Sequence, residues 1–326
     1  MLRDSYNRAH TYLRISLTDQ CNFRCVYCMP NEHMKFMPAG HLMNAKEILE
    51  IASLFVKQGI TKIRLTGGEP LVRKDFKEII EGLSTLPVEL TLTSNGVLIE
   101  EHLETLKKAN IRSINISLDT LQADKFARIT QRNLFEKVYK NIVLLVENDF
   151  HVKVNSVLIK GQNENEINDF ILLGKDLPIH IRFIEFMPFT GNHWDQSQVI
   201  THHQILEQIG SVYSYQKLED AKHDTAKKYK ITDFKGSFAI ITTMSEPFCG
   251  DCNRLRLTAD GKLKNCLFSA EESDLLSTLR EGKDILPIIT QTVLGKKFSQ
   301  GGQFAPSFEE TDPEKLVNRS MINIGG

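Results

Sequence analysis

The sequence predicts a barrel of parallel β/α units with a hydrophilic interior. Three observations predict this fold class. Strand-like and helix-like segments alternate over residues 11–187, which is typical of parallel β/α units. The strands carry apolar residues on one face and polar residues on the other. The most polar motifs follow the strands directly, where barrel enzymes place their active sites.

The strand-like runs are short, and helical patterns separate most of them. The runs lie at residues 11–18, 62–66, 89–95, 113–119, 152–159 and 181–187. A first helix is predicted between Asn44, which forms a capping-box pattern with Glu47, and Gly59, which suits a helix end. Further helices are predicted at about 75–86, 100–109, 135–148 and 164–177.

The two faces of the strands favour a barrel over an open sheet. The polar faces of the first five strands carry Arg14, Ser16, Thr18, Lys62, Arg64, Thr66, Thr91, Thr93, Asn115, Ser117, Asp119, Lys153 and Asn155. A doubly wound sheet is covered on both faces and should have apolar strands. Ordinary barrels fill their interior with Val, Ile and Leu, so this one is expected to hold a large polar ligand. In the sixth strand, Arg182 and Met187 have opposite parity, and the inward face stays open.

The composition is that of a soluble globular protein. Of the 326 residues, 41% are apolar and 25% are charged, and the formal net charge is -1. Such a charge provides no basic field for nucleic-acid binding. The first residues lack the apolar core of a signal peptide, and no apolar run approaches the ~20 residues that cross a bilayer. We therefore expect a cytoplasmic protein.

All six cysteines fall into two triads, which consist of Cys21, Cys25 and Cys28, and of Cys249, Cys252 and Cys266. Clustered cysteines in a reducing compartment are more often metal ligands than disulfides. Each triad lacks a nearby fourth ligand, although structural zinc and most iron–sulfur clusters take four. An open coordination position is typical of a reactive metal centre. A zinc knuckle or ribbon that borrows a distant ligand is the alternative.

The first triad has the spacing Cys-x3-Cys-x2-Cys, with Tyr27 before the last cysteine, and follows the first strand. This motif resembles that of the radical S-adenosylmethionine (SAM) superfamily. The resemblance implies a [4Fe–4S] cluster whose open iron binds SAM, which is cleaved to a 5′-deoxyadenosyl radical. The segment "TGGEP" resembles the glycine-rich segment of the family, so that Gly68 meets the methionine end of SAM. Ser117 matches a position that contacts SAM, and Met187 matches one near its adenine, although the sequence alone favours a core role for this methionine.

The second triad, in "CGDCNRLRLTADGKLKNCLF", has the spacing Cys-x2-Cys-x13-Cys. Together with the first triad it resembles the GTP 3′,8-cyclase family of molybdenum cofactor biosynthesis, also called cyclic pyranopterin monophosphate synthase protein A. This resemblance implies an incomplete (β/α)6 TIM-like barrel over residues 1–220. A C-terminal extension over residues 221–326 would close the barrel and carry a second [4Fe–4S] cluster, whose open iron binds guanine.

The reaction implied is that of a radical SAM lyase. The adenosyl radical takes the 3′ hydrogen of GTP, and C3′ then bonds to guanine C8. The product is (8S)-3′,8-cyclo-7,8-dihydroguanosine 5′-triphosphate. Cyclic pyranopterin monophosphate synthase would be the downstream enzyme, and flavodoxin or ferredoxin an electron donor. Neither nucleic acid nor a membrane is expected as a partner, and a homodimer is one oligomeric state left open.

Cations on the polar strand faces support a triphosphate ligand. A triphosphate carries about four negative charges and is suited to several Arg and Lys donors. The GTP contacts of the family carry over onto Arg14, Arg64, Thr93, Lys153, Arg254, Leu255 and Arg256, with Lys62, Asn155 and Arg182 as additions. Arg254 and Arg256, two apart on a strand-like run, can point at one ligand and are also expected to act in catalysis. A surface salt bridge could explain any one of these cations, but not the set.

The chain ends in "MINIGG", as the family does, and the resemblance implies that Gly325 and Gly326 reach into the active site as catalytic residues. Two segments depart from the family pattern: "DTAKKYKI" and "KKFSQGGQF", which lacks an expected histidine. Adjacent His202 and His203 are expected at the surface or at a helix start.

Two rival functions remain. One is another radical SAM enzyme with an auxiliary cluster, which modifies a peptide or RNA. The other is a zinc-stabilised binding module without catalysis. The module predicts zinc, whereas the enzyme predicts about eight irons per chain.

Overall fold

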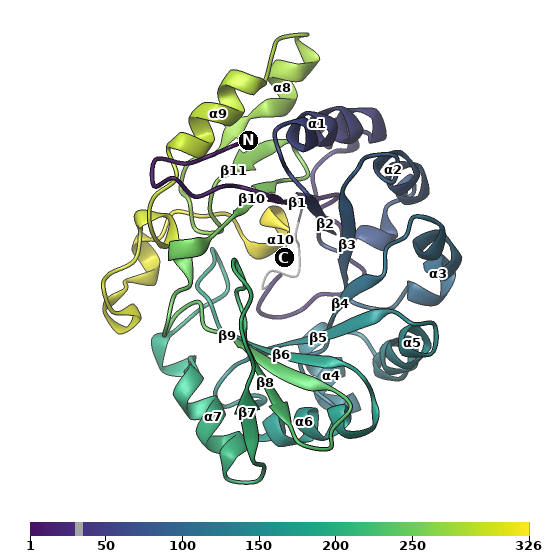
Figure 1. Cartoon of the computed structure of the whole chain (residues 1–326), viewed down its shortest axis with the longest axis vertical. Coiled ribbons are helices and arrows are strands. Elements are labelled where there is room, and N and C mark those ends of the chain that lie inside the picture. Colours follow the sequence, from purple (N-terminus) through teal and green to yellow (C-terminus); the bar gives the residue numbers. More distant parts are fainter. Residues whose placement is uncertain (30–34, 326) are drawn as a thin grey trace.

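A continuous mixed sheet organises the chain in the computed structural model, which describes residues 1–29 and 35–325 (Figure 1). Across these residues the strand order is β12-β11-β10-β1-β2-β3-β4-β5-β6-β9-β8-β7. The parallel centre consists of β1 (Tyr12–Ser16), β2 (Lys62–Thr66), β3 (Glu89–Ser94), β4 (Ser113–Ser117), β5 (His151–Leu158) and β6 (His180–Glu185). The two end strands of the order are not paired with each other, so the barrel is incomplete.

Helices cover the outside of the strands (Figure 1). They are α1 (Ala45–Lys57), α2 (Phe76–Leu83), α3 (Ile99–Lys108), α4 (Ala123–Thr130), α5 (Phe135–Glu147), α6 (Ile167–Asp176) and α7 (His202–Gly210). The predicted capping box is confirmed, because the Glu47 amide donates to Asn44 Oδ1 at 3.0 Å and the Asn44 amide donates to Glu47 Oε2 at 2.8 Å. The sequence analysis did not predict α4 or α7. His202 does lie at the start of α7, which is one of the two positions expected for it.

The predicted faces of the strands are confirmed. Leu13, Ile63 and Leu92 are fully buried in the core between sheet and helices. Most of the predicted polar residues, such as Arg14, Arg64 and Lys153, line the cavity inside the barrel. Arg182 fixes the inward face of β6, which the sequence left open. Met187 has the opposite parity because β6 ends at Glu185, and the alternation of a strand does not extend into the following loop.

The C-terminal part adds strands to both edges of the parallel centre. On one edge, β9 (Ser237–Ile241) pairs with β6 in parallel and leads to β8 (Lys227–Ile231) and β7 (Tyr215–Lys217). On the other edge, β10 (Arg254–Leu257) pairs with β1 in parallel, which confirms the strand-like run around Arg254. The remaining elements are β11 (Lys262–Lys264), β12 (Ser273–Asp274), α8 (Leu275–Arg280), α9 (Leu286–Leu294) and α10 (Met321–Ile324).

Figure 1 places α10 inside the ring of strands. The predicted division at residue 220 falls between β7 and β8, and it stays a prediction. Among the described residues, no helix has the length and apolar character of a membrane span. The cytoplasmic location also stays a prediction.

Candidate functional site

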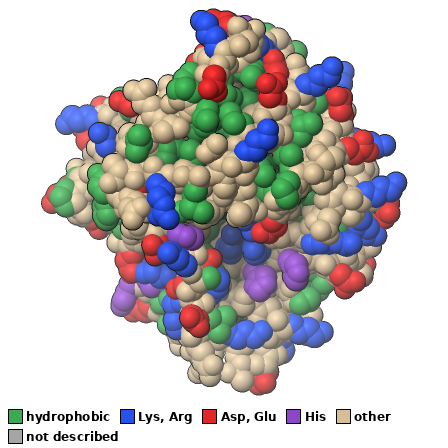
Figure 2. Space-filling view, turned by 45° about the horizontal axis from the view of Figure 1, so that its top comes forward, with side chains coloured by type: hydrophobic (Ala, Val, Ile, Leu, Met, Phe, Trp, Pro, Cys, Tyr) green, Lys and Arg blue, Asp and Glu red, His purple; other side chains and the backbone are tan. Residues whose placement is uncertain are grey.

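A cavity of about 630 Å³ occupies the barrel interior, and all six cysteines line it. Polar residues of the central strands and of β10 form one part of the remaining wall, and apolar residues such as Phe23, Phe248 and Phe268 form another part. Figure 2 shows Lys and Arg side chains in the depth of a hollow, with histidines near its edge. Its volume is in the range of sites that hold small molecules. The two triads therefore face one chamber, as the sequence predicted.

The first triad lies in the loop after β1. The amide of Cys28 donates to the carbonyl of Cys25 at 3.0 Å, and the resulting turn brings these two cysteines together. The Phe23 amide donates to Cys21 Sγ at 3.4 Å. Burial raises the pKa of Cys21 to about 11 and the pKa of Cys28 to about 12. A positive metal centre would reverse this effect, because coordination to a metal deprotonates a thiol.

Three sulfurs that face one cavity fit a [4Fe–4S] cluster better than a single ion. Burial raises the pKa of Cys25, and the charges of Cys28 and Cys21 raise it further, so the three thiols lie within electrostatic reach of one another. A four-iron cube binds its thiolates on separate irons.

Tyr27 stands beside the first triad and is fixed by a buried carboxylate. Its hydroxyl donates to Asp119 Oδ2 at 2.6 Å, and the Val157 amide donates to Asp119 Oδ1 at 2.8 Å. Burial raises the pKa of Asp119 to about 6. Ser117 and Met187 line the same cavity. Asp119 was not predicted as a site residue, although its motif "LDT" after the fourth strand was the available signal.

The loop after β2 passes close to the loop of the first triad. The Gly68 amide donates to the carbonyl of Thr18 at 2.7 Å, and a Cβ at Gly68 would lie 2.3 Å from the carbonyl oxygen of Gln20. Only glycine allows so close an approach of two backbones. Backbone packing alone therefore accounts for glycine at this position. Gly68 also lines the cavity, so it could contact a ligand as well.

Glu69, the next residue, ties β2 to the end of β3. It is completely buried and accepts hydrogen bonds from Ser94 Oγ at 2.9 Å and from the Asn95 amide at 2.6 Å. Burial raises the pKa of Glu69 to about 7. Asn95 Nδ2 lies 3.8 Å from Cys21 Sγ, so Glu69 indirectly supports the first triad. The sequence prediction did not include Glu69 or Asn95.

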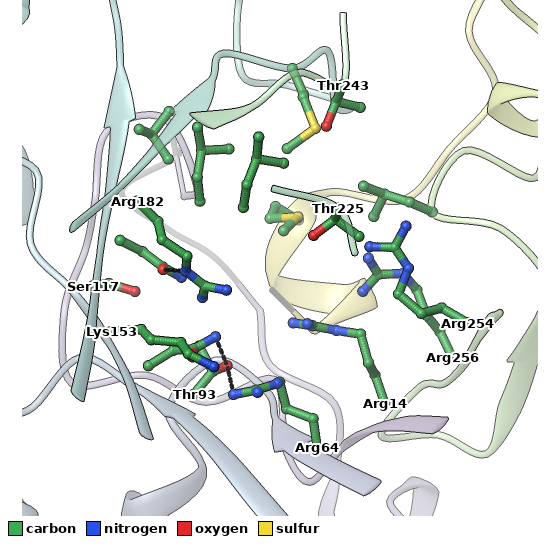
Figure 3. A pocket seen from close by; sticks show the side chains of 18 of the residues that line it. Arg14, Arg64, Thr93, Ser117, Lys153, Arg182, Thr225, Thr243, Arg254 and Arg256 are labelled. Atoms are coloured by element: carbon green, nitrogen blue, oxygen red, sulfur yellow. Dashed lines mark hydrogen bonds between the residues drawn. The ribbon is translucent and has the colours of Figure 1, made fainter. Parts of the chain in front are cut away.

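Three arginines stand side by side on adjacent parallel strands. Arg14 of β1 has Arg256 of β10 as its register partner on one side and Arg64 of β2 on the other. Figure 3 shows their side chains pointing into the cavity, with Lys153 and Arg182 across from them. Since adjacent strands are about 4.8 Å apart, like charges in such a row repel one another.

Burial and this repulsion together lower the pKa of several cations of the cavity. Burial, followed by the charges of neighbouring arginines, lowers the pKa of Arg14 to about 10 and that of Arg182 to about 9. Burial and Arg182 lower the pKa of Lys153 to about 8. Tyr12 accepts a hydrogen bond from Arg64 Nε at 2.6 Å, and the charges of Arg64 and Arg14 outweigh burial and lower its pKa to about 7. The negative charge of a bound polyanion would oppose this repulsion and raise the pKa of Arg14, Arg182 and Lys153 again.

The second triad has a more cationic environment than the first. Lys296 Nζ lies 3.4 Å from Cys252 Sγ, and Arg254 Nη2 lies 3.7 Å from the same sulfur. Burial alone would raise the pKa of Cys252, but the charges of Arg254 and Lys296 outweigh it and lower the pKa to about 6. Burial raises the pKa of Cys266. The Gln300 amide, in the segment that departs from the family pattern, donates to Cys249 Sγ at 3.4 Å.

The remaining predicted site residues lie in different places. Thr93 lines the cavity, and its hydroxyl accepts from Arg64 Nη1 at 3.5 Å. The side chain of Leu255 is fully buried in the core, so only its backbone is left to meet a ligand. The carbonyl of Gly325 accepts a hydrogen bond from Arg256 Nη1 at 3.4 Å. Gly325 has a φ of +88°, and a Cβ at this position would lie 2.7 Å from Ser16 Cβ. Gly326 lies outside the described residues.

Comparison with known proteins covers nearly the whole chain. Residues 15–174 match the model of the radical SAM superfamily, and residues 179–300 match the model of Molybdenum Cofactor Synthesis C. The fold is similar to that of Streptococcus suis SuiB bound to S-adenosylmethionine, with a TM-score of 0.65 over 97% of this chain and 74% of that chain. At 14% identity this likeness concerns the fold alone, and it confirms the incomplete barrel.

Three relatives are similar over the full chain. The mitochondrial GTP 3′,8-cyclase of Arabidopsis thaliana is 44% identical over 100% of this chain and 84% of its own length. The GTP 3′,8-cyclase of Listeria monocytogenes is 38% identical over 100% of this chain and 99% of its own length. Human molybdenum cofactor biosynthesis protein 1 is 45% identical over 99% of this chain, which spans 51% of the human protein. Membership of the superfamily implies one [4Fe–4S] cluster and SAM. The chain belongs to the radical SAM superfamily and, within it, to the family of the GTP 3′,8-cyclases.

Proposed function

We propose that this protein is a radical SAM lyase that converts GTP to (8S)-3′,8-cyclo-7,8-dihydroguanosine 5′-triphosphate in molybdenum cofactor biosynthesis. One observation carries the proposal: two sulfur triads and a row of three arginines face a single cavity. The first triad, Cys21, Cys25 and Cys28, would hold the cluster that binds SAM. The second triad, Cys249, Cys252 and Cys266, would hold a second [4Fe–4S] cluster.

The chain's own residues have three tasks in this reaction. The cations hold the triphosphate, so that the ribose and the base take a fixed position between the triads. Tyr27, Gly68, Ser117 and Met187, which line the cavity, would contact SAM. Gly325 packs against β1 and β2 and accepts a hydrogen bond from Arg256, which lines the cavity and would help to hold the nucleotide.

With a cluster held by Cys21, Cys25 and Cys28, and with SAM bound, transfer of one electron would release methionine and supply a 5′-deoxyadenosyl radical. GTP loses its 3′ hydrogen to this radical and gains the bond between C3′ and C8, and a further electron and a proton complete the dihydro product. The electrons come from a one-electron donor such as flavodoxin or ferredoxin. The product passes to cyclic pyranopterin monophosphate synthase. A homodimer stays a proposal about the oligomeric state.

The proposal is tested with anaerobically reconstituted protein, SAM and dithionite. We expect about eight irons per chain, and we expect GTP but not ATP to give a cyclised nucleotide together with 5′-deoxyadenosine. Parallel reactions contain a peptide pool or RNA in place of GTP. Modification of a peptide or RNA, with no product from GTP, would overturn the proposal. Zinc in place of iron would favour a binding module without catalysis.

Removal of one charge from the arginine row should weaken GTP binding selectively. A hydrogen bond to a charged group contributes about 1.5–3 kcal/mol, so Arg256→Met is expected to raise the Kd of GTP by roughly 10- to 150-fold. The Kd of SAM should change by less than about twofold. Equilibrium dialysis of both ligands measures the two effects. Arg128→Met, an exposed arginine on α4, is the matched control. Equal losses for GTP and SAM would contradict the assignment of Arg256.

A further inference from the structure

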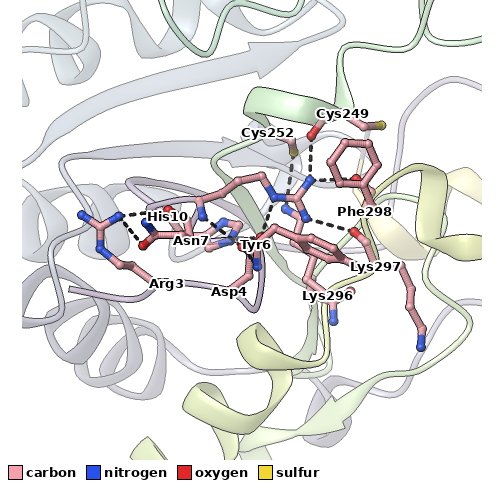
Figure 4. Close-up of polar contacts among 12 residues, drawn as sticks. Arg3, Asp4, Tyr6, Asn7, His10, Cys249, Cys252, Lys296, Lys297 and Phe298 are labelled. Carbon is pink, nitrogen blue, oxygen red and sulfur yellow. Dashed lines mark hydrogen bonds and ion pairs between the residues drawn. The ribbon is translucent and has the colours of Figure 1, made fainter.

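The N-terminal segment, residues 3–10, folds back on itself and packs next to the second triad (Figure 4). At its centre is Asp4, whose side chain is completely buried. Asp4 Oδ2 accepts from Arg8 Nε at 2.6 Å and lies 3.2 Å from His10 Nε2, while Asp4 Oδ1 accepts from the Arg8 amide at 3.0 Å. The carboxylate therefore fixes both the backbone and the guanidinium of Arg8.

Arg8 uses the rest of its guanidinium to hold two distant segments. Its Nη1 donates to the carbonyl of Cys249 and to the carbonyl of Phe298, both at 2.7 Å. Its Nη2 donates to the carbonyl of Lys297 at 3.0 Å. The guanidinium also lies 5.1 Å from the ring centroid of Tyr6 and 5.7 Å from that of Phe298. One side chain thus joins a proposed cluster ligand to the turn at residues 296–298.

That turn carries a lysine directed at another cysteine of the same triad. Lys296 is only 3% exposed, and its Nζ donates to Cys252 Sγ at 3.4 Å and to the carbonyl of Arg254 at 3.0 Å. A buried ammonium needs partners of this kind, since an unpaired buried charge is costly. Because Arg8 holds the carbonyls of the next two residues, it also restrains the backbone that carries Lys296.

We propose that Asp4, Arg8 and Lys296 form an N-terminal clamp that positions the second sulfur triad for its cluster and sets the electrostatic environment of that cluster. The proposal rests on the second cluster of the proposed function. These are positioning residues: Arg8 fixes the Cys249 backbone, and Lys296 donates to the Cys252 sulfur. Hydrogen bonds and positive charge at ligand sulfurs make an iron–sulfur cluster easier to reduce. The first triad has no contact with the clamp among the described residues.

The clamp predicts that the two clusters respond differently to its loss. The Arg8→Met variant should lose the second cluster, so that its iron content falls from about eight to about four per chain. Cleavage of SAM without cyclisation should persist within about twofold, because the first triad is intact. Lys296→Met should retain iron, and the potential of the second cluster should shift to more negative values. Lys296→Arg should restore the wild-type potential of the second cluster. If Lys296 had only a structural role, neither substitution would change this potential.

The measurements are iron analysis, potentiometric titration followed by electron paramagnetic resonance, and detection of 5′-deoxyadenosine. Arg3→Met and Lys297→Met are the matched controls, because both side chains are exposed and lie next to the clamp. If Arg8→Met fails to fold, the potential of the Lys296→Met variant decides.

The outcomes separate this inference from the proposed function. A wild-type chain that takes up only about four irons would overturn the second cluster itself. The clamp alone would be overturned by a different result. In that case the wild type holds about eight irons per chain, and Arg8→Met and Lys296→Met have the same iron content and the same two cluster potentials as the wild type. Equal loss of both clusters in Arg8→Met would also overturn it, since the effect would then not be specific to the second triad.

Discussion

Replacement of Cys28 by alanine is expected to abolish SAM cleavage and, with it, the conversion of GTP. Cys28 closes the turn that begins at Cys25, and its thiol lines the cavity at the first triad. In a cluster held by three cysteines, one of the four irons is open to SAM. Loss of one more cysteine leaves only two protein ligands to hold the cluster. Since residues that merely support metal ligands already contribute 10- to 100-fold, a decrease of more than roughly 100-fold in 5′-deoxyadenosine formation is expected.

The assay uses anaerobically reconstituted variant with dithionite and SAM. Val26→Ala is the matched control, because Val26 lies in the same loop, is 42% exposed and contributes no sulfur. Its rate should stay within about twofold of the unchanged protein. A Cys28→Ala variant that retains a tenth or more of the SAM cleavage would mean that Cys28 does not hold the reactive cluster.

Replacement of Cys266 by alanine is expected to separate the two halves of the reaction. Cys266 lies in the second triad, and no hydrogen bond among the described residues joins its sulfur to the first triad. The variant should still produce 5′-deoxyadenosine from SAM, but formation of the cyclised nucleotide should fall by more than roughly 100-fold. Its iron content should drop to about four per chain.

Both products are quantified in the same reaction by liquid chromatography with mass detection. Glu271→Ala, an exposed position five residues further on, is the control for local disturbance. Loss of SAM cleavage in Cys266→Ala would argue against separate roles of the two triads. Full cyclisation by that variant would remove the second cluster from the mechanism.

Much of the barrel could be predicted because strand geometry fixes which residues share a face. Alternate side chains of a strand point to opposite sides. Arg14, Arg64 and Lys153 could therefore be assigned to the interior from sequence, and the structure places all three in the cavity lining. The predicted cap of α1 depended on local hydrogen bonds between Asn44 and Glu47, which sequence spacing also encodes.

What escaped prediction depends on contacts between distant segments. The run at Arg254 could be identified as a strand, but nothing local specifies that β10 pairs with β1 and so places Arg256 beside Arg14. Arg8 contacts the carbonyl of Cys249 across 241 positions of sequence. Glu69 was missed because burial, and not its motif, gives it partners on β3. Such residues are recognised only when the packing is known.

The pairing of β10 with β1 has a consequence for biosynthesis of the chain. During translation, residues 1–220 emerge first, and at that stage β1 and β6 are the exposed borders of a parallel sheet whose later partners are β10 and β9. Unpaired strand borders are prone to aggregation, and parallel sheets form slowly. We therefore expect a chaperone to be most effective against aggregation of the nascent chain during this interval. That interval ends when the segment around Arg254–Leu257 leaves the ribosome and covers the first strand.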